Sequence, residues 1–216
     1  MLAGVMGLVL ASVSGCAAPP EEDDSTIAAD EASALTSPPL GESDMVPIGK
    51  PAGMPDVWGQ PDAEGFLDAR GKCGPTAVAN VLRLYGIEVS PPEADRDGAH
   101  WYVGARDVDL LDYMQGHHAQ LGCGIEHPAN GGRFLRDSLA TGRPVMIVFM
   151  FGNGLQSHWV AAVGRRGKGA DEKIIVMSWG QYYTIPMAKL LASWRNVYGT
   201  RNTTVVCDAT TSHIAR

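Results

Sequence analysis

The chain has 216 residues, of which 45% are hydrophobic, and a formal net charge of −7 at pH 7. This length and composition suit one domain with a full hydrophobic core. Residues 17–44 hold eight carboxylates and neither Lys nor Arg, so the rest of the chain is close to neutral. A near-neutral domain lacks the basic surface that nucleic-acid binding uses, and no nucleic-acid partner is expected.

The amino-terminal residues 2–15 are small or apolar and carry no charge, and they end in Val13-Ser14-Gly15 before Cys16. The stretch is too short to span a bilayer as a helix. It resembles the signal peptide and lipobox of bacterial lipoproteins, which implies cleavage before Cys16 and attachment of lipid to it. An ordinary secretory signal, or a chance apolar stretch, is the alternative. Because Ala17 and not an aspartate follows Cys16, the resemblance implies a lipid-anchored protein of the bacterial cell envelope, at the outer rather than the inner membrane.

Residues 16–45 are acidic and contain four prolines. Such a stretch buries too little apolar surface to offset the entropy of ordering it, so we expect a disordered tether here. The sequence therefore divides into a signal peptide over residues 1–15, a tether over residues 16–45 and one folded domain over residues 46–216. It contains no internal repeat.

The first expected element of the domain is a helix that begins at Cys73. Pro75 suits a first helical turn, Gly86 suits the end of a helix, and apolar residues recur between them at helical spacing at Val78, Val81, Leu82 and Tyr85. Unpaired amides and the helix dipole favour an anion at this end, so the position favours a Cys73 thiolate.

Two further helices are expected over residues 107–118 and 132–142. Strands follow, the first over residues 142–151 and the second starting at His158 after the Asn153-Gly154 turn region. More strands are expected over residues 174–179, 182–186 and 203–209, with a helix over residues 187–196 between the last two. Helices followed by an antiparallel sheet predict an α+β domain.

Four segments carry a resemblance to a known family: CGPTAVANVLRLYG from Cys73, GRPVMIVFMF from Gly142, HWVAAVG from His158, and IIVMSWGQYY after it. Over residues 57–197 the chain resembles the papain-like cysteine peptidases, most closely the peptidase C39-like group. The resemblance implies a papain-like fold, with the cysteine at a helix start and the histidine on a strand of an antiparallel sheet. It also implies that Cys73 is the nucleophile and His158 the general base. The alternative for each is an ordinary core residue.

Two positions depart from the family pattern. Such enzymes place an Asp or Asn after the next strand to orient the histidine, but Met177 stands there, and Ser178 or Gln181 would have to take over. The family's oxyanion donor is a Gln a few residues before the cysteine, whereas the nearest candidate here is Gln60, thirteen positions upstream. Trp179 follows the strand expected beside His158, and of the five tryptophans we expect it to touch the site.

With Cys16 lipidated and Cys73 in the site, Cys123 and Cys207 remain as an even pair in an exported chain. They form either a disulfide or two buried thiols. Zinc-compatible residue types also cluster between His117 and His127, but their spacing matches no closed zinc site. We expect no metal and no other cofactor.

Two hypotheses about function follow. The first is an envelope-anchored cysteine peptidase, or a related amidase, that cleaves peptide bonds of a peptide or protein substrate through a thioester. The second is a catalytically silent papain-like module that binds a peptide or an envelope component in the same cleft. Peptidoglycan hydrolysis is disfavoured, because the related group with that activity has Asp-Cys-Ser where this chain has Cys-Gly-Pro. The sequence indicates neither the substrate nor the oligomeric state.

Overall fold

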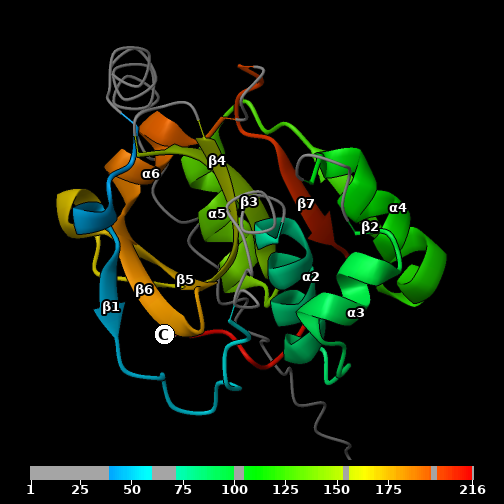
Figure 1. Cartoon of the computed structure of the whole chain (residues 1–216). Helices are drawn as coiled ribbons and strands as arrows, with labels where there is room; N and C mark the ends of the chain where they lie inside the picture. Colours follow the sequence, from blue (N-terminus) through cyan, green and yellow to red (C-terminus); the bar gives the residue numbers. More distant parts are fainter. Residues whose placement is uncertain (1–38, 60–71, 100–104, 153–155, 196–198, 216) are drawn as a thin grey trace, which may run out of the picture.

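The computed structural model describes residues 39–59, 72–99, 105–152, 156–195 and 199–215 (Figure 1). Within them the sheet is antiparallel and has the strand order β1-β6-β5-β4-β3-β7-β2. The strands are β1 (Val46–Ile48), β2 (Cys123–Glu126), β3 (Val145–Phe151), β4 (Gln156–Arg166), β5 (Lys173–Ser178), β6 (Gln181–Pro186) and β7 (Thr204–Cys207). The helices are α2 (Cys73–Leu84), α3 (Pro91–Arg96), α4 (Asp107–His118), α5 (Gly131–Ala140) and α6 (Met187–Ser193), with short 3-10 turns η1 (Glu42–Asp44), η2 (Ala119–Leu121) and η3 (Gly169–Asp171).

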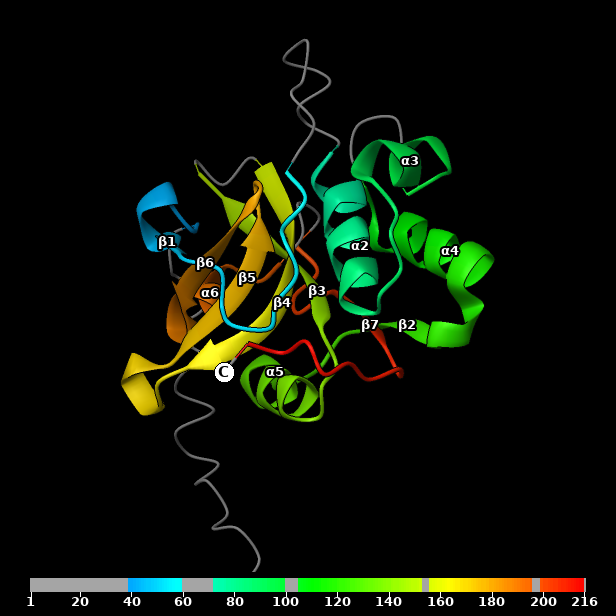
Figure 2. The same ribbon diagram turned by 90° about the horizontal axis from the view of Figure 1, so that it is seen from below.

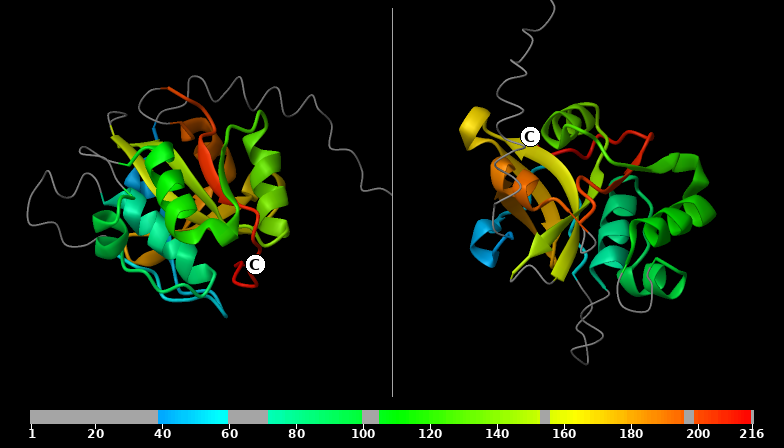
Figure 3. Two further views of the ribbon diagram at one scale, coloured as in Figure 1. Left: turned by 90° about the vertical axis from the view of Figure 1, so that its right-hand side faces the viewer. Right: turned by 90° about the horizontal axis from the view of Figure 1, so that it is seen from above.

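Helices cover both faces of the sheet. Figure 2 and Figure 3 show α2, α3 and α4 together on one side of the sheet. The buried hydrophobic residues form two clusters, one on each side of the sheet, and the residues of α5 and α6 belong to the cluster on the other side. Successive side chains of a strand point to opposite faces, and β4 follows this rule. Its residues Trp159, Ala161 and Val163 belong to the core under α2, and Val160 and Ala162 to the core under α5 and α6. The strand that carries His158 is thus buried from both sides.

The α+β class expected from the sequence is confirmed, with helices leading and the antiparallel sheet following. The helix expected over residues 107–118 is α4. Three elements were not predicted, namely α3, β1 and β2. All three are short, and β1 contains Pro47, which an edge strand tolerates because its outer side needs no donor.

The packed part of the chain begins before the boundary expected at residue 45. Leu40 is 1% exposed, and its N–H donates to the Met150 carbonyl at 3.0 Å while its own carbonyl accepts from Gly152 N–H at 2.9 Å. Met45 is also buried. These contacts add the end of the expected tether to the core under α5 and α6.

Several expected features lie outside the described residues. These are the signal peptide with Cys16, the tether up to residue 38, Gln60 and the Asn153-Gly154 turn. Among the helices that the structure describes, none has the length and apolar character needed to cross a bilayer.

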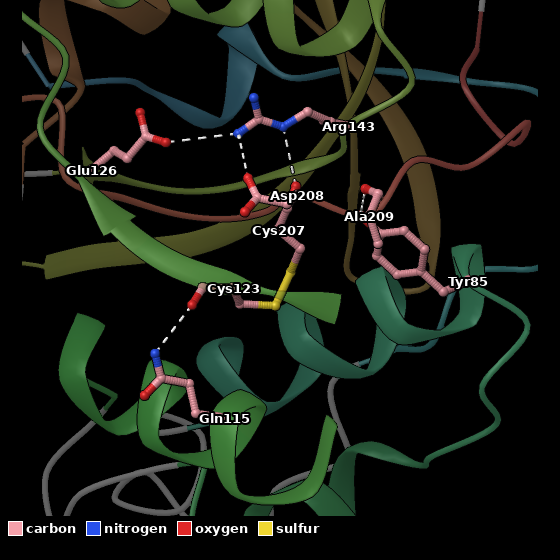
Figure 4. Close-up of a disulfide and its surroundings, with 8 residues drawn as sticks. All are labelled: Tyr85, Gln115, Cys123, Glu126, Arg143, Cys207, Asp208 and Ala209. Carbon is pink, nitrogen blue, oxygen red and sulfur yellow. Dashed lines mark hydrogen bonds and ion pairs between the residues drawn. A yellow bond between two sulfur atoms is a disulfide. The ribbon is translucent and has the colours of Figure 1, made fainter. Parts of the chain in front are cut away.

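A disulfide joins Cys123 to Cys207, which stand opposite each other in the β2–β7 ladder (Figure 4). Gln115 of α4 donates to the Cys123 carbonyl at 3.1 Å, and Arg143 donates to the Cys207 carbonyl at 3.1 Å. Of the two states that the sequence left open, the structure has the bridged one. Cys123 is therefore unavailable to a metal, and the described residues contain no group of three or more potential metal ligands.

Candidate active site

Cys73 is the first residue of α2 and a free cysteine, only 7% exposed. Lys72 occupies the N-cap position without a side-chain capping bond, and its carbonyl accepts from the Thr76 N–H at 3.0 Å and the Thr76 hydroxyl at 2.6 Å. Gly74 allows Ala105 to pack directly on this first turn, since a Cβ at Gly74 would stand 2.1 Å from the Ala105 Cβ. The start of the helix is therefore covered by the chain that leads into α4.

This cover changes the electrostatics of the thiol. Burial is the largest effect and raises the pKa of Cys73, while the backbone amides of Trp159, Gly74 and Cys73 itself lower it. The amides at the helix start thus favour the thiolate, as the sequence indicated, but desolvation outweighs them. The expected thiolate is corrected to a protonated thiol in this closed arrangement.

His158 lies near the start of β4, opposite Phe149 in the β3–β4 ladder. Three aromatic rings surround its imidazole. Trp179 stacks on it with ring centroids 4.4 Å apart and planes inclined by 18°, and Phe149 and Phe151 have centroids at 5.7 and 5.9 Å. This burial lowers the pKa of His158 to about 3, with no contribution from a charged group. The imidazole is therefore neutral at physiological pH.

Ser178, the last residue of β5, is the polar partner of this ring. Its Oγ lies 2.8 Å from His158 Nε2, and both residues are buried. When Nε2 carries the ring proton and donates it to Oγ, Nδ1 keeps a lone pair and can act as a base. Within the described part of the chain, Nδ1 has no hydrogen-bond partner.

The other residues considered as orienting groups point elsewhere. Gln181 is exposed and donates to the Tyr183 hydroxyl at 2.5 Å. Met177 is 1% exposed and belongs to the core under α2, on the face of the sheet away from the imidazole. Of the two residues expected to orient His158, the structure brings only Ser178 to it.

Cys73 and His158 approach the same point of β4 from its two sides. The thiol lies beside the backbone amide of Trp159, the residue that follows His158. The Trp159 indole points to the α2 side and donates to the Ala105 carbonyl at 2.9 Å, whereas the His158 ring packs on the opposite side with Phe149. Among the described residues, no hydrogen bond joins the two side chains.

Trp179 reaches the imidazole from a tight turn between β5 and β6. It has φ 44° and Gly180 has φ 78°, so both central residues of this two-residue hairpin adopt positive φ. Glycine does so without strain, but a residue with a Cβ pays on the order of 1 kcal/mol. The stacking on His158 gives this unusual tryptophan a role, and it places Trp179 in contact with the candidate base.

The solved structures that are similar to this chain include two peptidases of transporters. One is the peptidase domain of Streptococcus ComA, a bifunctional ABC transporter involved in a quorum sensing pathway, with 14% identity and a TM-score of 0.47. The other is a double glycine motif protease from an AMS/PCAT transporter in complex with the leader peptide, with 20% identity and a TM-score of 0.45. Each alignment covers 76% of this chain and 98% of the other. No protein-family model and no curated protein matches the sequence. At these identities the likeness says nothing about activity.

Proposed function

We propose that this protein is a papain-like cysteine peptidase of the C39-like group, with Cys73 as nucleophile and His158 as general base. One observation carries the proposal. The free thiol of Cys73, at a helix start, lies beside the backbone amide of Trp159, the residue that follows His158. One ring nitrogen of His158 is bound by Ser178, and the other has no partner among the described residues. A nucleophile, a base and a group that orients the base are the parts that covalent catalysis needs.

In the proposed reaction, Cys73 Sγ attacks the carbonyl carbon of a peptide bond while His158 Nδ1 takes the thiol proton. The C–N bond breaks, the imidazole returns this proton to the leaving amine, and a thioester remains. Water then attacks the thioester, and its proton passes through the imidazole to the departing thiolate. The backbone amide of Cys73 is one proposed donor to the oxyanion, and Gln60 is the other. In the structure the thiol and the imidazole lie on the two sides of β4, so this proton transfer requires the His158 ring to turn toward Cys73.

The test is to trap the acyl-enzyme. The full chain is incubated with a mixture of peptide thioesters, quenched in acid, digested and analysed by mass spectrometry for acylation of Cys73. We expect acylation in the wild type, none in Cys73→Ala, and a much slower rate in His158→Gln. Acylation at the same rate in His158→Gln would show that the thiol reacts without a base and would reject the dyad.

The silent binding module is the second candidate, and a specific observation favours it. Cys73 and His158 are each 7% exposed, and no hydrogen bond joins them in the described residues. A module of this kind would bind peptides without acylation of Cys73, and its affinity would be the same in Cys73→Ala. Peptide binding measured by calorimetry beside the trapping experiment separates the two candidates.

We also propose that the protein is lipid-anchored in the bacterial cell envelope through Cys16, at the outer membrane. The support is the uncharged segment of residues 2–15 and the small residues before Cys16. Cys16→Ser is expected to leave the domain folded and to release it from the membrane fraction. A variant that stays in that fraction after a carbonate wash would reject the anchor.

A further inference from the structure

Asn80 is a buried polar residue whose side chain serves neither the sheet nor its own helix. It lies seven residues after Cys73 on α2, which places it on the same face of the helix about 10 Å further along. It is fully buried. Its Oδ1 accepts from the Trp58 N–H at 2.8 Å, and its Nδ2 donates to the Trp58 carbonyl at 3.3 Å. The whole amide is thus used to hold one residue of the main chain.

Trp58 belongs to a segment of residues 55–59, here called the crossing segment, which Figure 2 shows in cyan between α2 and the sheet. The helix holds this segment at two more points. Arg83 donates to the Asp56 carbonyl at 3.1 Å, and its guanidinium lies 4.5 Å from the centre of the Trp58 ring. On the sheet side, the Tyr182 hydroxyl donates to the Pro55 carbonyl at 2.7 Å. The crossing segment therefore ties the helix of Cys73 to β6.

The last residue of the crossing segment reaches the turn that covers the site. A Cβ on Gly59 would lie 3.7 Å from the Gly180 Cα, and a Cβ on Gly180 would lie 3.5 Å from the Gly59 Cα, so the two main chains are in contact. Gly180 directly follows Trp179, whose indole stacks on His158. A continuous set of contacts thus runs from Asn80 through Trp58 and Gly59 to the imidazole.

We propose that Asn80 is a positioning residue, which fixes the crossing segment and through it holds the Trp179 turn over His158. The proposal rests on the proposed role of His158 as the base. The side-chain hydrogen bonds that Asn80 makes within the described residues go to the main chain of Trp58, so its proposed effect passes through that residue. Loss of the amide would leave the Trp58 N–H and carbonyl without these partners in a partly buried place, which favours release of the segment.

The test follows the titration of the His158 imidazole by NMR in the full chain labelled with 13C-histidine, with the signal assigned from His158→Gln. In Asn80→Leu the turn loosens and water reaches the ring, so the pKa of His158 should rise by about one unit or more from its low value. Trp179→Ala, which uncovers the ring directly, should give a rise of the same direction. Asn80→Asp keeps the acceptor and loses the donor, and an intermediate rise is expected.

The matched control is Thr204→Val in β7, which removes one buried hydrogen bond, from the Thr204 hydroxyl to the Met146 carbonyl at 2.6 Å. This variant is destabilised but should leave the titration of His158 unchanged. If Asn80→Leu and Asn80→Asp titrate like Thr204→Val, the proposal is overturned. Should Asn80→Leu fail to fold, Asn80→Asp alone decides.

The experiment needs no substrate, so it separates this proposal from the proposed function. A shifted titration without any acylation of Cys73 would reject the peptidase and retain the positioning role. Where acylation occurs, Asn80→Leu should lower kcat by about tenfold with little change in KM, because it misplaces the base and leaves the substrate contacts intact. An increase in KM alone would overturn the positioning role.

Discussion

The burial of His158 as a neutral imidazole makes a quantitative prediction about acid stability. Burial lowers the pKa of His158 from 6.5 to about 3. Between these values the unfolded chain takes up a proton that the folded protein refuses, so the stabilisation is complete above pH 6.5 and is lost as the pH falls toward 3. At one pKa unit per 1.36 kcal/mol, a change from pH 7 to pH 4 should remove about 3 kcal/mol of folding free energy through this residue alone.

Urea unfolding of the wild type and of His158→Gln at both pH values isolates this contribution. Glutamine does not titrate and can still bond to Ser178, and the titration of all other groups cancels in the comparison. The wild type should lose about 3 kcal/mol more than the variant between pH 7 and pH 4. An equal loss in both proteins would refute the reasoning, because it would mean that the folded protein protonates His158 as readily as the unfolded chain does.

The remaining predictions concern the site and the disulfide. Ser178→Ala should slow acylation of Cys73 about tenfold or more, since an unpaired buried ring nitrogen costs about 1–3 kcal/mol; an unchanged rate would remove the serine from the site. Met177→Asn should not raise that rate and should lower the midpoint of urea unfolding; faster acylation would contradict the assigned geometry. Alkylation of Cys73 by iodoacetamide should stay slow at pH 7 and rise only above about pH 8.5, because burial raises the thiol pKa; fast labelling at pH 6 would show a thiolate. Replacing both Cys123 and Cys207 by serine, which opens a link across 84 positions, should reduce the unfolding free energy by up to about 4–5 kcal/mol; calorimetry that finds no change would deny the bridge a stabilising role.

The elements that sequence reasoning predicted are those whose signals are local and long. The strand over residues 145–151 is buried on both faces and reads as a continuous apolar run. The helix over residues 107–118 was expected from residues within it, and α4 has these bounds. The four-residue β2 has no such signal, because it is held by its pairing with β7 and by the bridge to Cys207, 84 positions away.

The electrostatics of the site could not be predicted in the same way. The start of a helix at Cys73 is a local property, and it was expected from Pro75 and the apolar spacing that follows. The burial that raises the thiol pKa is not local, because Ala105 packs on Gly74 and the Trp159 indole donates to Ala105. The start of a helix favours a thiolate only where water also reaches the thiol. The sequence gives no local sign that Ala105 and Trp159 bury Cys73.

The choice between Met177 and Ser178 could have been made from alternation along the strands. His158 shares its face of β4 with Val160 and Ala162, and β4 and β5 pair so that Ala161 stands opposite Met177. Residues paired across two strands share a face of the sheet, so Met177 shares the face of Ala161, toward α2. Consecutive residues of one strand lie on opposite faces, so Ser178 shares the face of His158. An alignment of motifs treats adjacent positions as nearly equivalent, but in a sheet they lie on opposite sides. The group that orients a strand histidine must therefore be sought at the matching parity of the neighbouring strand, and here that residue is a serine.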